Sequence, residues 1–95
     1  MNIVWSPQAI EDLISLRAYI EAESPAGARR IVLRILHVLE DLLPEKPHMG
    51  RPGRVPGTRE LVIQQAPYIV PYRVQGDNIQ ILRVYHSARR WPESL

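Results

Sequence analysis

The sequence predicts an α+β domain with the element order β-α-α-β-β-β, in which an N-terminal strand and a helical hairpin pack on a small antiparallel β-sheet. Two apolar stripes with helical spacing each follow a Ser-Pro pair. A loop rich in proline and glycine comes next, and after it alternating β-type segments are bounded by turn residues. The 95 residues form one domain, residues 1–95, and are too few for a second.

The first strand and both helices are defined by their boundaries. Met1–Trp5 is a short apolar run that stops at Ser6-Pro7, an N-cap followed by proline at the first helical position. Apolar residues at helical spacing then predict a helix from about Pro7 to Ala22. The same signal at Ser24-Pro25 begins a second helix, which Pro44 should end. Because only a short turn joins the helices, they should form an antiparallel hairpin.

The second half of the chain is predicted to be a loop followed by three strands. Residues 44–57 contain four prolines and three glycines, which favour a loop. The strands expected after it are Leu61–Ala66, Tyr68–Val74 and Ile79–Tyr85, joined by short connections into an antiparallel meander. Pro71 removes a donor from the middle strand and indicates a bulge or an edge. The helical hairpin should cover one sheet face, leaving the other to carry function.

Several classes of protein are disfavoured by composition. The chain has no cysteine, so it holds neither a disulfide nor a thiolate zinc site. No HExxH or similar spacing links its histidines, and we expect no metal and no cofactor. Glu11 and Asp12 interrupt the N-terminus before a signal-peptide core develops, and no run is long enough to span a membrane. We therefore expect a cytoplasmic protein with no membrane partner.

Basic residues are concentrated in the second half. Residues 1–50 carry five basic against seven acidic residues, whereas residues 51–95 carry seven arginines against three acidic residues. Arginine forms planar, bidentate contacts with phosphate and carboxylate groups. The asymmetry indicates a polyanionic or acidic partner, and a solvated basic surface is the alternative.

The densest cluster of candidate functional residues lies at the end of the last strand. Arg83 and Tyr85 share a strand face by their spacing, and Arg59 and Arg73 extend the basic surface over neighbouring strands. One interpretation is metal-independent RNA cleavage, with His86 as acid or base, a phosphate held by arginine and a base stacked on an aromatic ring. The residues available for the last two roles are Arg83, Arg89, Arg90, Tyr85 and Trp91. The alternative is a hydrogen-bonded His86 among solvated arginines. Tyr68 and Tyr72 are expected to pack in the core.

Four segments resemble the RelE/ParE toxins, in order and along nearly the whole chain: WSPQAIEDLISLRAYI, GRPGRVPGTRELVI, APYIVPYRV and ILRVYHSARRWP. The resemblance implies the toxin of a type II toxin–antitoxin system, associated with growth inhibition and plasmid stabilization. It also implies a cognate antitoxin whose C-terminal segment wraps the toxin as a hetero-oligomer, often adding helices or a strand. An acidic wrapping segment would suit the basic half of this chain.

The family divides by target, and the resemblance is closer to the ParE-like members. RelE-like members cut mRNA on the ribosome, whereas ParE-like members inhibit DNA gyrase without cutting RNA. RNA-cutting members commonly carry an arginine where Ile69 follows Tyr68, and some carry a lysine-rich loop that is absent here. We therefore expect a non-enzymatic gyrase inhibitor. Its target- or antitoxin-binding surface would comprise Arg59, Arg73, Arg83, Tyr85, Arg89, Arg90 and Trp91.

Two alternatives stay open. The chain would be a ribosome-dependent mRNA endonuclease if His86 acts with Arg83, Arg89 or Arg90. It would be a toxin-like module without toxicity if it only binds its antitoxin.

Overall fold

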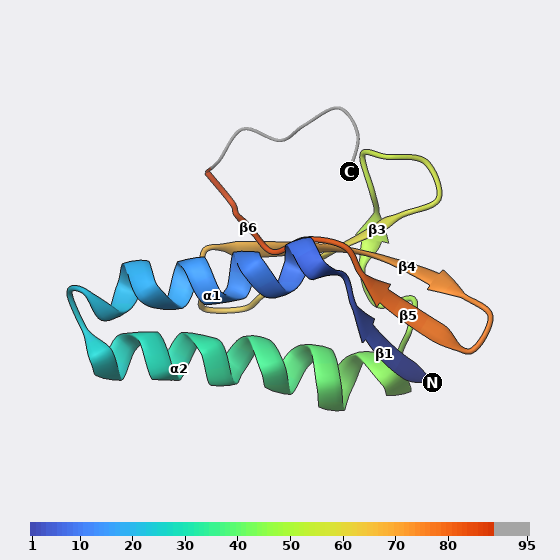
Figure 1. The fold of residues 1–95 in the computed structure, drawn as a ribbon. Coiled ribbons are helices and arrows are strands. Elements are labelled where there is room, and N and C mark those ends of the chain that lie inside the picture. Colours follow the sequence, from blue (N-terminus) through green and yellow to red (C-terminus); the bar gives the residue numbers. More distant parts are fainter. Residues whose placement is uncertain (89–95) are drawn as a thin grey trace.

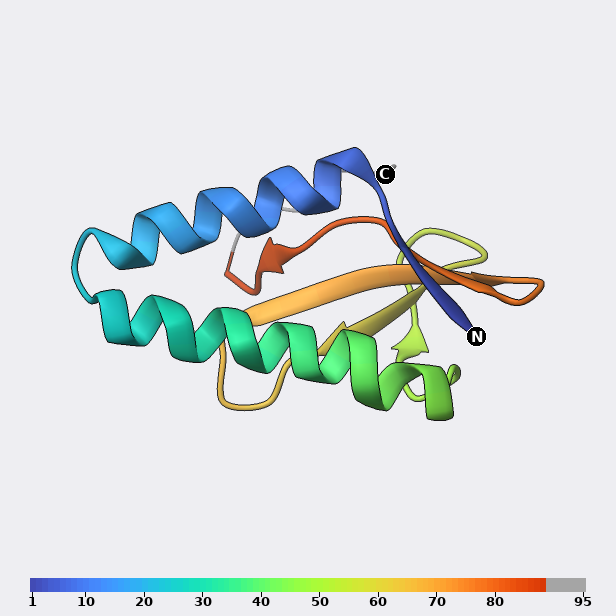
Figure 2. The same ribbon diagram turned by 60° about the horizontal axis from the view of Figure 1, so that its bottom comes forward.

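The protein has two layers, a helical hairpin and a mixed six-stranded sheet, as expected for the predicted α+β class (Figure 1). The computed structural model describes residues 1–88. Helices α1 (Pro7–Glu21) and α2 (Pro25–Leu36) lie antiparallel along one face of the sheet, which a second view shows from below (Figure 2). The strand order is β1-β5-β4-β3-β2, and β6 also pairs with β4.

Both predicted helix starts are confirmed. The hydroxyl groups of Ser6 and Ser24 each accept a hydrogen bond of 3.0 Å from the backbone nitrogen three residues later, and a proline follows each cap. The predicted end of the second helix is wrong. The helical path continues after α2 through a π-helical turn (His37–Leu42) and a 3₁₀ turn (Leu43–Glu45), so Pro44 lies inside the last helical turn. A proline early in such a turn needs no backbone donor.

The three-strand meander is confirmed, with shifted boundaries and two additions. Strands β3, β4 and β5 are antiparallel neighbours. Strand β1 joins the sheet by pairing in parallel with β5, which makes the sheet mixed. Within the predicted loop, β2 pairs with the start of β3. The strands are β1 (Asn2–Trp5), β2 (Arg51–Pro52), β3 (Arg59–Val62), β4 (Tyr68–Gln75), β5 (Asn78–Ile81) and β6 (Tyr85–His86).

The predicted last strand, Ile79–Tyr85, is interrupted by a bulge opposite Pro71. Tyr72 pairs with Ile81, but Ile69 pairs with Tyr85, so residues 82–84 face only residues 70 and 71 of β4. The backbone nitrogen of Leu82 donates to the Pro71 carbonyl at 3.0 Å. Since both backbone groups of a strand residue point the same way, the Pro71 nitrogen faces this bulge. The interruption explains how an interior strand accommodates a proline that can donate no hydrogen bond.

The core fills the space between the hairpin and the sheet. Tyr68, Val70 and Tyr72 of β4 alternate toward the helices, which confirms the expected packing of both tyrosines. The fully buried side chains of this core are Ile35, Leu39, Leu43, Ile63, Val70, Tyr72, Ile79 and Ile81. Among residues 1–88, no helix combines the length and the apolar character that crossing a membrane requires.

Candidate functional site

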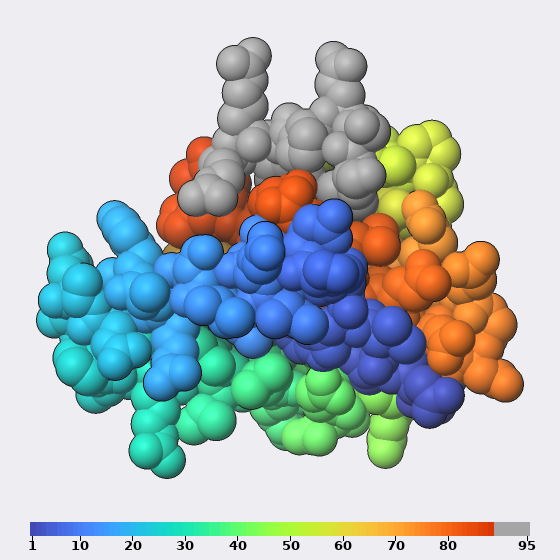
Figure 3. Space-filling model, viewed as in Figure 1, coloured from blue at the N-terminus to red at the C-terminus, as the bar shows by residue number. Residues whose placement is uncertain are grey.

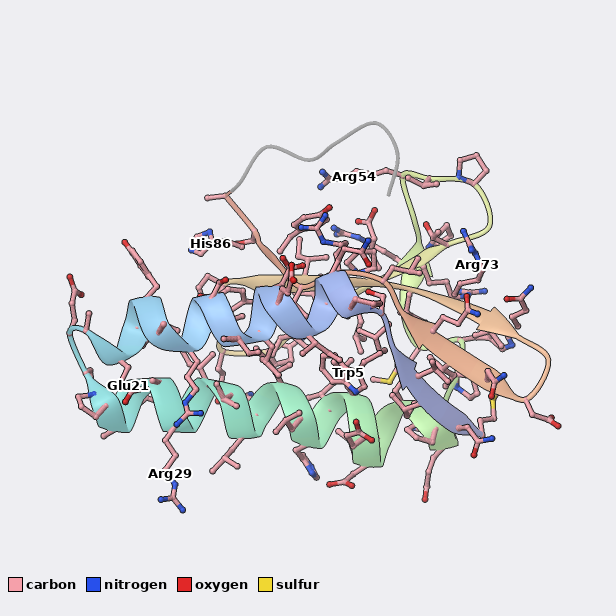
Figure 4. The ribbon with its side chains drawn as sticks, in the orientation of Figure 1. Trp5, Glu21, Arg29, Arg54, Arg73 and His86 are labelled. Atoms are coloured by element: carbon pink, nitrogen blue, oxygen red, sulfur yellow. The ribbon has the colours of Figure 1, made fainter. Side chains whose placement is uncertain are left out.

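The candidate residues do not all lie on one side of the sheet. Arg54 and Arg73 project on the side that the helices leave uncovered (Figure 4), whereas His86 pairs in register with the helix-facing Tyr68 and lies beside α1. The structure brings Arg83, Tyr85 and His86 together around the bulge and β6. The predicted residues Arg89, Arg90 and Trp91 lie outside the described residues.

Arg83 is bound to the first helix. Its Nε and Nη2 atoms donate to the two carboxylate oxygens of Asp12 at 2.8 and 3.0 Å. Donating these hydrogen bonds to Asp12 raises the pKa of Arg83 above its ordinary value. The guanidinium carbon also lies 4.7 Å from the ring centre of Tyr85, a stacking arrangement favourable to a cation. Arg83 is thus fixed by a carboxylate and an aromatic ring of its own chain.

His86 is held at β6 by a backbone hydrogen bond. Its Nδ1 atom accepts from the nitrogen of Ala88 at 3.1 Å, so the neutral ring carries its proton on Nε2. The ring meets that of Tyr68 edge to face, with 5.5 Å between centroids. Within the described part of the chain, no carboxylate and no arginine forms an ion pair or hydrogen bond with the imidazole.

A groove of about 710 Å³ runs between α1 and β6 beside this histidine. Its apolar lining comes from Leu16, Tyr68 and Val84, which are nearly buried. Asp12, Ser15 and His86 add polar groups to its lining. The groove therefore offers an apolar floor with a few polar atoms, a composition common in binding sites.

Arg59 holds the loop before β2 and does not extend freely into solvent. Its Nη1 atom donates to the carbonyl of Gly50 at 2.8 Å. The buried Tyr72 hydroxyl accepts from the Gly50 nitrogen at 2.9 Å and donates to the Pro47 carbonyl at 2.8 Å. Burial raises the pKa of Tyr72 above its ordinary value of 10.0. Glycine is required at position 50, because a Cβ would lie 2.7 Å from the Tyr72 ring.

Glu60 is a buried carboxylate that pattern analysis did not single out. Only 3% of its side chain is exposed, and it accepts from Arg51 Nη2 at 3.2 Å and from the Arg54 nitrogen at 2.8 Å. The Arg54 Nε atom lies 3.7 Å from the same carboxylate. Glu60 thereby fixes the segment of residues 51–54 over the sheet. Its position directly after an arginine-rich loop was the available signal.

Arg73 differs from its neighbours. It is half-buried on β4 and pairs in register with Gln80 of β5. Among residues 1–88 no carboxylate or backbone carbonyl is bonded to its guanidinium. Over the same residues, no group of three or more histidines and carboxylates is arranged to hold a metal ion.

Comparison with known proteins identifies the family. The model of the family described as "ParE toxin of type II toxin-antitoxin system, parDE" matches residues 3–91. The protein Y4kP of Sinorhizobium fredii is 45% identical over 94 residues, 99% of this chain and 96% of its own length. Toxin RelE2 of Caulobacter vibrioides is 39% identical over 88 residues, 93% of this chain and 97% of its own.

A solved structure agrees with these relatives. The chromosomal ParDE toxin–antitoxin system from P. aeruginosa contains a chain that superposes with a TM-score of 0.75 at 32% identity. The match covers 90% of this chain and 95% of that one. The protein therefore belongs to the ParE toxins of type II toxin–antitoxin systems, within the RelE/ParE superfamily.

Proposed function

We propose that this toxin inhibits DNA gyrase by binding it, catalyses no reaction itself, and is neutralised by a cognate antitoxin that covers its basic sheet face. The observation that carries the proposal is the pairing of Arg83 with Asp12. Stabilising the charge that develops on a phosphate requires a cation directed at that phosphate. Arg83 is instead directed at a carboxylate of its own chain, next to the only histidine near the cluster in residues 1–88.

The state of His86 supports the same proposal. A base must present an unprotonated nitrogen to the hydroxyl it activates. Here Nδ1 already accepts from Ala88, which leaves Nε2 protonated in the neutral ring. Ile69, paired with Tyr85, supplies an aliphatic side chain where a phosphate ligand would be useful.

One observation favours the second candidate, a ribosome-dependent mRNA endonuclease. His86 lines the groove between α1 and β6, where a substrate group would reach its ring. The two candidates differ in what the toxin does to DNA topology and to mRNA, so both readouts belong in one experiment.

The experiment incubates purified toxin with gyrase, relaxed plasmid and ATP, and in parallel with ribosomes programmed with mRNA. We expect lost supercoiling or trapped cleaved DNA with intact mRNA. Cut mRNA with normal supercoiling would establish the endonuclease instead. A toxin that binds its antitoxin but shows neither activity when free would be a module that has lost toxicity.

His86→Gln separates binding from catalysis in the cell. If His86 is only a contact residue, the variant toxin should lose about tenfold in inhibitory potency or less. If His86 is a catalytic acid or base, the variant should lose on the order of a thousandfold in potency. We expect growth inhibition to persist, measured as colony formation after induction at matched toxin levels. His37→Gln is the matched control, because His37 is exposed in the π-helical turn after α2 and pairs only with the nearby Asp41 in the described chain.

A further inference from the structure

The bulge of residues 82–84 lacks the hydrogen bonds that normally hold a strand. In a regular antiparallel ladder, Leu82 and its partner Pro71 would exchange two backbone bonds. Only one of them forms, because proline has no backbone donor. The sheet therefore leaves the Leu82 carbonyl and the two residues after it to be held by other groups.

The first helix and its N-cap residue supply those groups. The Ser6 hydroxyl donates to the Leu82 carbonyl at 2.7 Å, where a donor at position 71 would otherwise bind. One carboxylate oxygen of Asp12 accepts from the Val84 nitrogen at 3.0 Å and from Arg83 Nε at 2.8 Å. Only 14% of the Asp12 side chain is exposed, so water competes weakly for these bonds. Figure 3 shows α1 directly against the segment that contains the bulge.

We propose that Asp12 is a positioning residue, which replaces the missing sheet contacts at the bulge and thereby seats the buried Tyr85 and places His86 for partner binding. A bulge bends its strand and redirects the residues that follow. Here Val84 is turned into the core, and β6 then pairs with β4 at Tyr68 and Ile69. The inclusion of β6 in the partner-binding surface rests on the proposed function. The role of Asp12 in positioning β6 does not depend on that function.

Three substitutions distinguish the two kinds of contact that Asp12 makes. Asp12→Ala removes the acceptor of the Val84 nitrogen together with the ion pair. Asp12→Asn keeps an oxygen for Val84 but removes the charge that binds Arg83. Arg83→Gln removes the ion pair and leaves the carboxylate in place. If Asp12 acts through the backbone, Asp12→Ala should have a much larger effect than the other two.

The control uses an ion pair of similar type on the same helix. Arg17 and Glu21 pair at 3.5 Å, with side chains 65% and 50% exposed. Glu21→Ala removes a carboxylate from α1 without touching the bulge. It should behave as wild type in every measurement.

Amide hydrogen exchange of the folded protein is the first measurement. In Asp12→Ala we expect the amides of Val84 and Tyr85 to exchange at least about tenfold faster, while amides of β3 stay as protected as in wild type. Equal loosening of all strands, or unchanged exchange at the bulge, would overturn the proposal by making Asp12 an ordinary stability contact. Should Asp12→Ala fail to fold, Asp12→Asn and Arg83→Gln still test the proposal: both keep an acceptor for the Val84 nitrogen, so the amides of Val84 and Tyr85 should stay protected, and faster exchange there in either variant would overturn it.

Binding of antitoxin or gyrase is the second measurement. We expect Asp12→Ala to weaken binding about tenfold or more at a temperature where it is fully folded, and Asp12→Asn to retain most of the affinity. Full affinity in a protein with a loosened bulge would overturn the link to partner binding. Absence of gyrase inhibition in wild type contradicts the proposed function alone, since the exchange result does not depend on the target.

Discussion

The two faces of the sheet are stabilised by different interactions. The helix-covered face is closed by apolar side chains such as Leu39, Val70 and Tyr72, none of which retains exposed surface. The opposite face carries charged groups that are fixed individually, with Glu60 beneath Arg51 and Arg54. At the margin of α1, Asp12 fixes Arg83 in the same way. One face is therefore held by packing and the other by directed polar contacts.

The arginines in the basic half of the chain do not form one uniform cationic surface, although their number alone would predict one. In the described residues, Arg59 binds backbone carbonyls and Arg83 binds Asp12, whereas Arg73 makes no such contact. Some of these arginines therefore stabilise the local structure as well as contribute positive charge, so substituting them should have unequal effects on stability and on binding.

Removing a packed side chain from the helix-covered face should have the largest effect on stability. Leu39→Ala leaves a cavity under fully buried neighbours, and we expect a loss of about 3 kcal/mol in the free energy of unfolding. Urea denaturation measures it. Leu33→Ala on α2, where the side chain is 52% exposed, should cost under about 1 kcal/mol. Similar losses at both positions would remove the basis for the comparison.

Tyr72 contributes both kinds of stabilisation, because its ring is packed in the core and its hydroxyl makes directed hydrogen bonds. Tyr72→Phe keeps the packing but leaves the buried Gly50 nitrogen without its acceptor, at a cost of about 2 kcal/mol. The raised pKa of Tyr72 adds a pH dependence. Because the folded state favours the neutral phenol, the stabilisation is complete below an ordinary pKa of about 10 and is lost as pH rises through the folded pKa.

Unfolding free energies across pH 8 to about 11 test this linkage. The alkaline fall in stability should be smaller in Tyr72→Phe than in wild type. Tyr19→Phe, at a side chain that is 80% exposed, serves as the control and should keep the wild-type profile. An unchanged alkaline profile in Tyr72→Phe would contradict the role of burial.

The polar contacts of the open face should show a smaller effect that depends on salt. Glu60→Gln removes the charge beneath two arginines that are each about half exposed, so we expect a loss of about 1 kcal/mol. High salt should narrow the difference between variant and wild type, as followed by urea midpoints at two ionic strengths. A salt-independent difference would indicate that packing around Glu60 matters more than its charge.

Arg73 should matter least to stability and most directly to binding. Arg73→Ala should change the free energy of unfolding by less than about 0.5 kcal/mol. Loss of an outward cation should nevertheless weaken the antitoxin complex about fivefold at low salt. Isothermal titration calorimetry measures the affinity, and Arg17→Ala on α1 is the matched control. Equal effects of the two changes would exclude a special role for the β4 position.

Local signals in the sequence predicted most of the fold. The Ser-Pro pairs marked both helix starts, and the expected core packing of Tyr68 and Tyr72 in β4 was correct. The bulge was harder to locate, because Pro71 indicates an irregularity without saying which neighbour adjusts. The partners of Arg83 and Arg59 were not predictable from spacing. Asp12 lies 71 positions from Arg83, so only the folded topology brings the two together.

The parallel pairing of β1 with β5 also has a consequence for synthesis. Residues 2–5 emerge first, yet the strand that completes their hydrogen bonds is residues 78–81. Contacts so distant in sequence form late, because a long loop must close before they are made. The nascent chain therefore leaves its first strand unpaired until residues 78–81 have been made. The complete sheet, and with it the surface that an antitoxin would cover, cannot form before that point in synthesis.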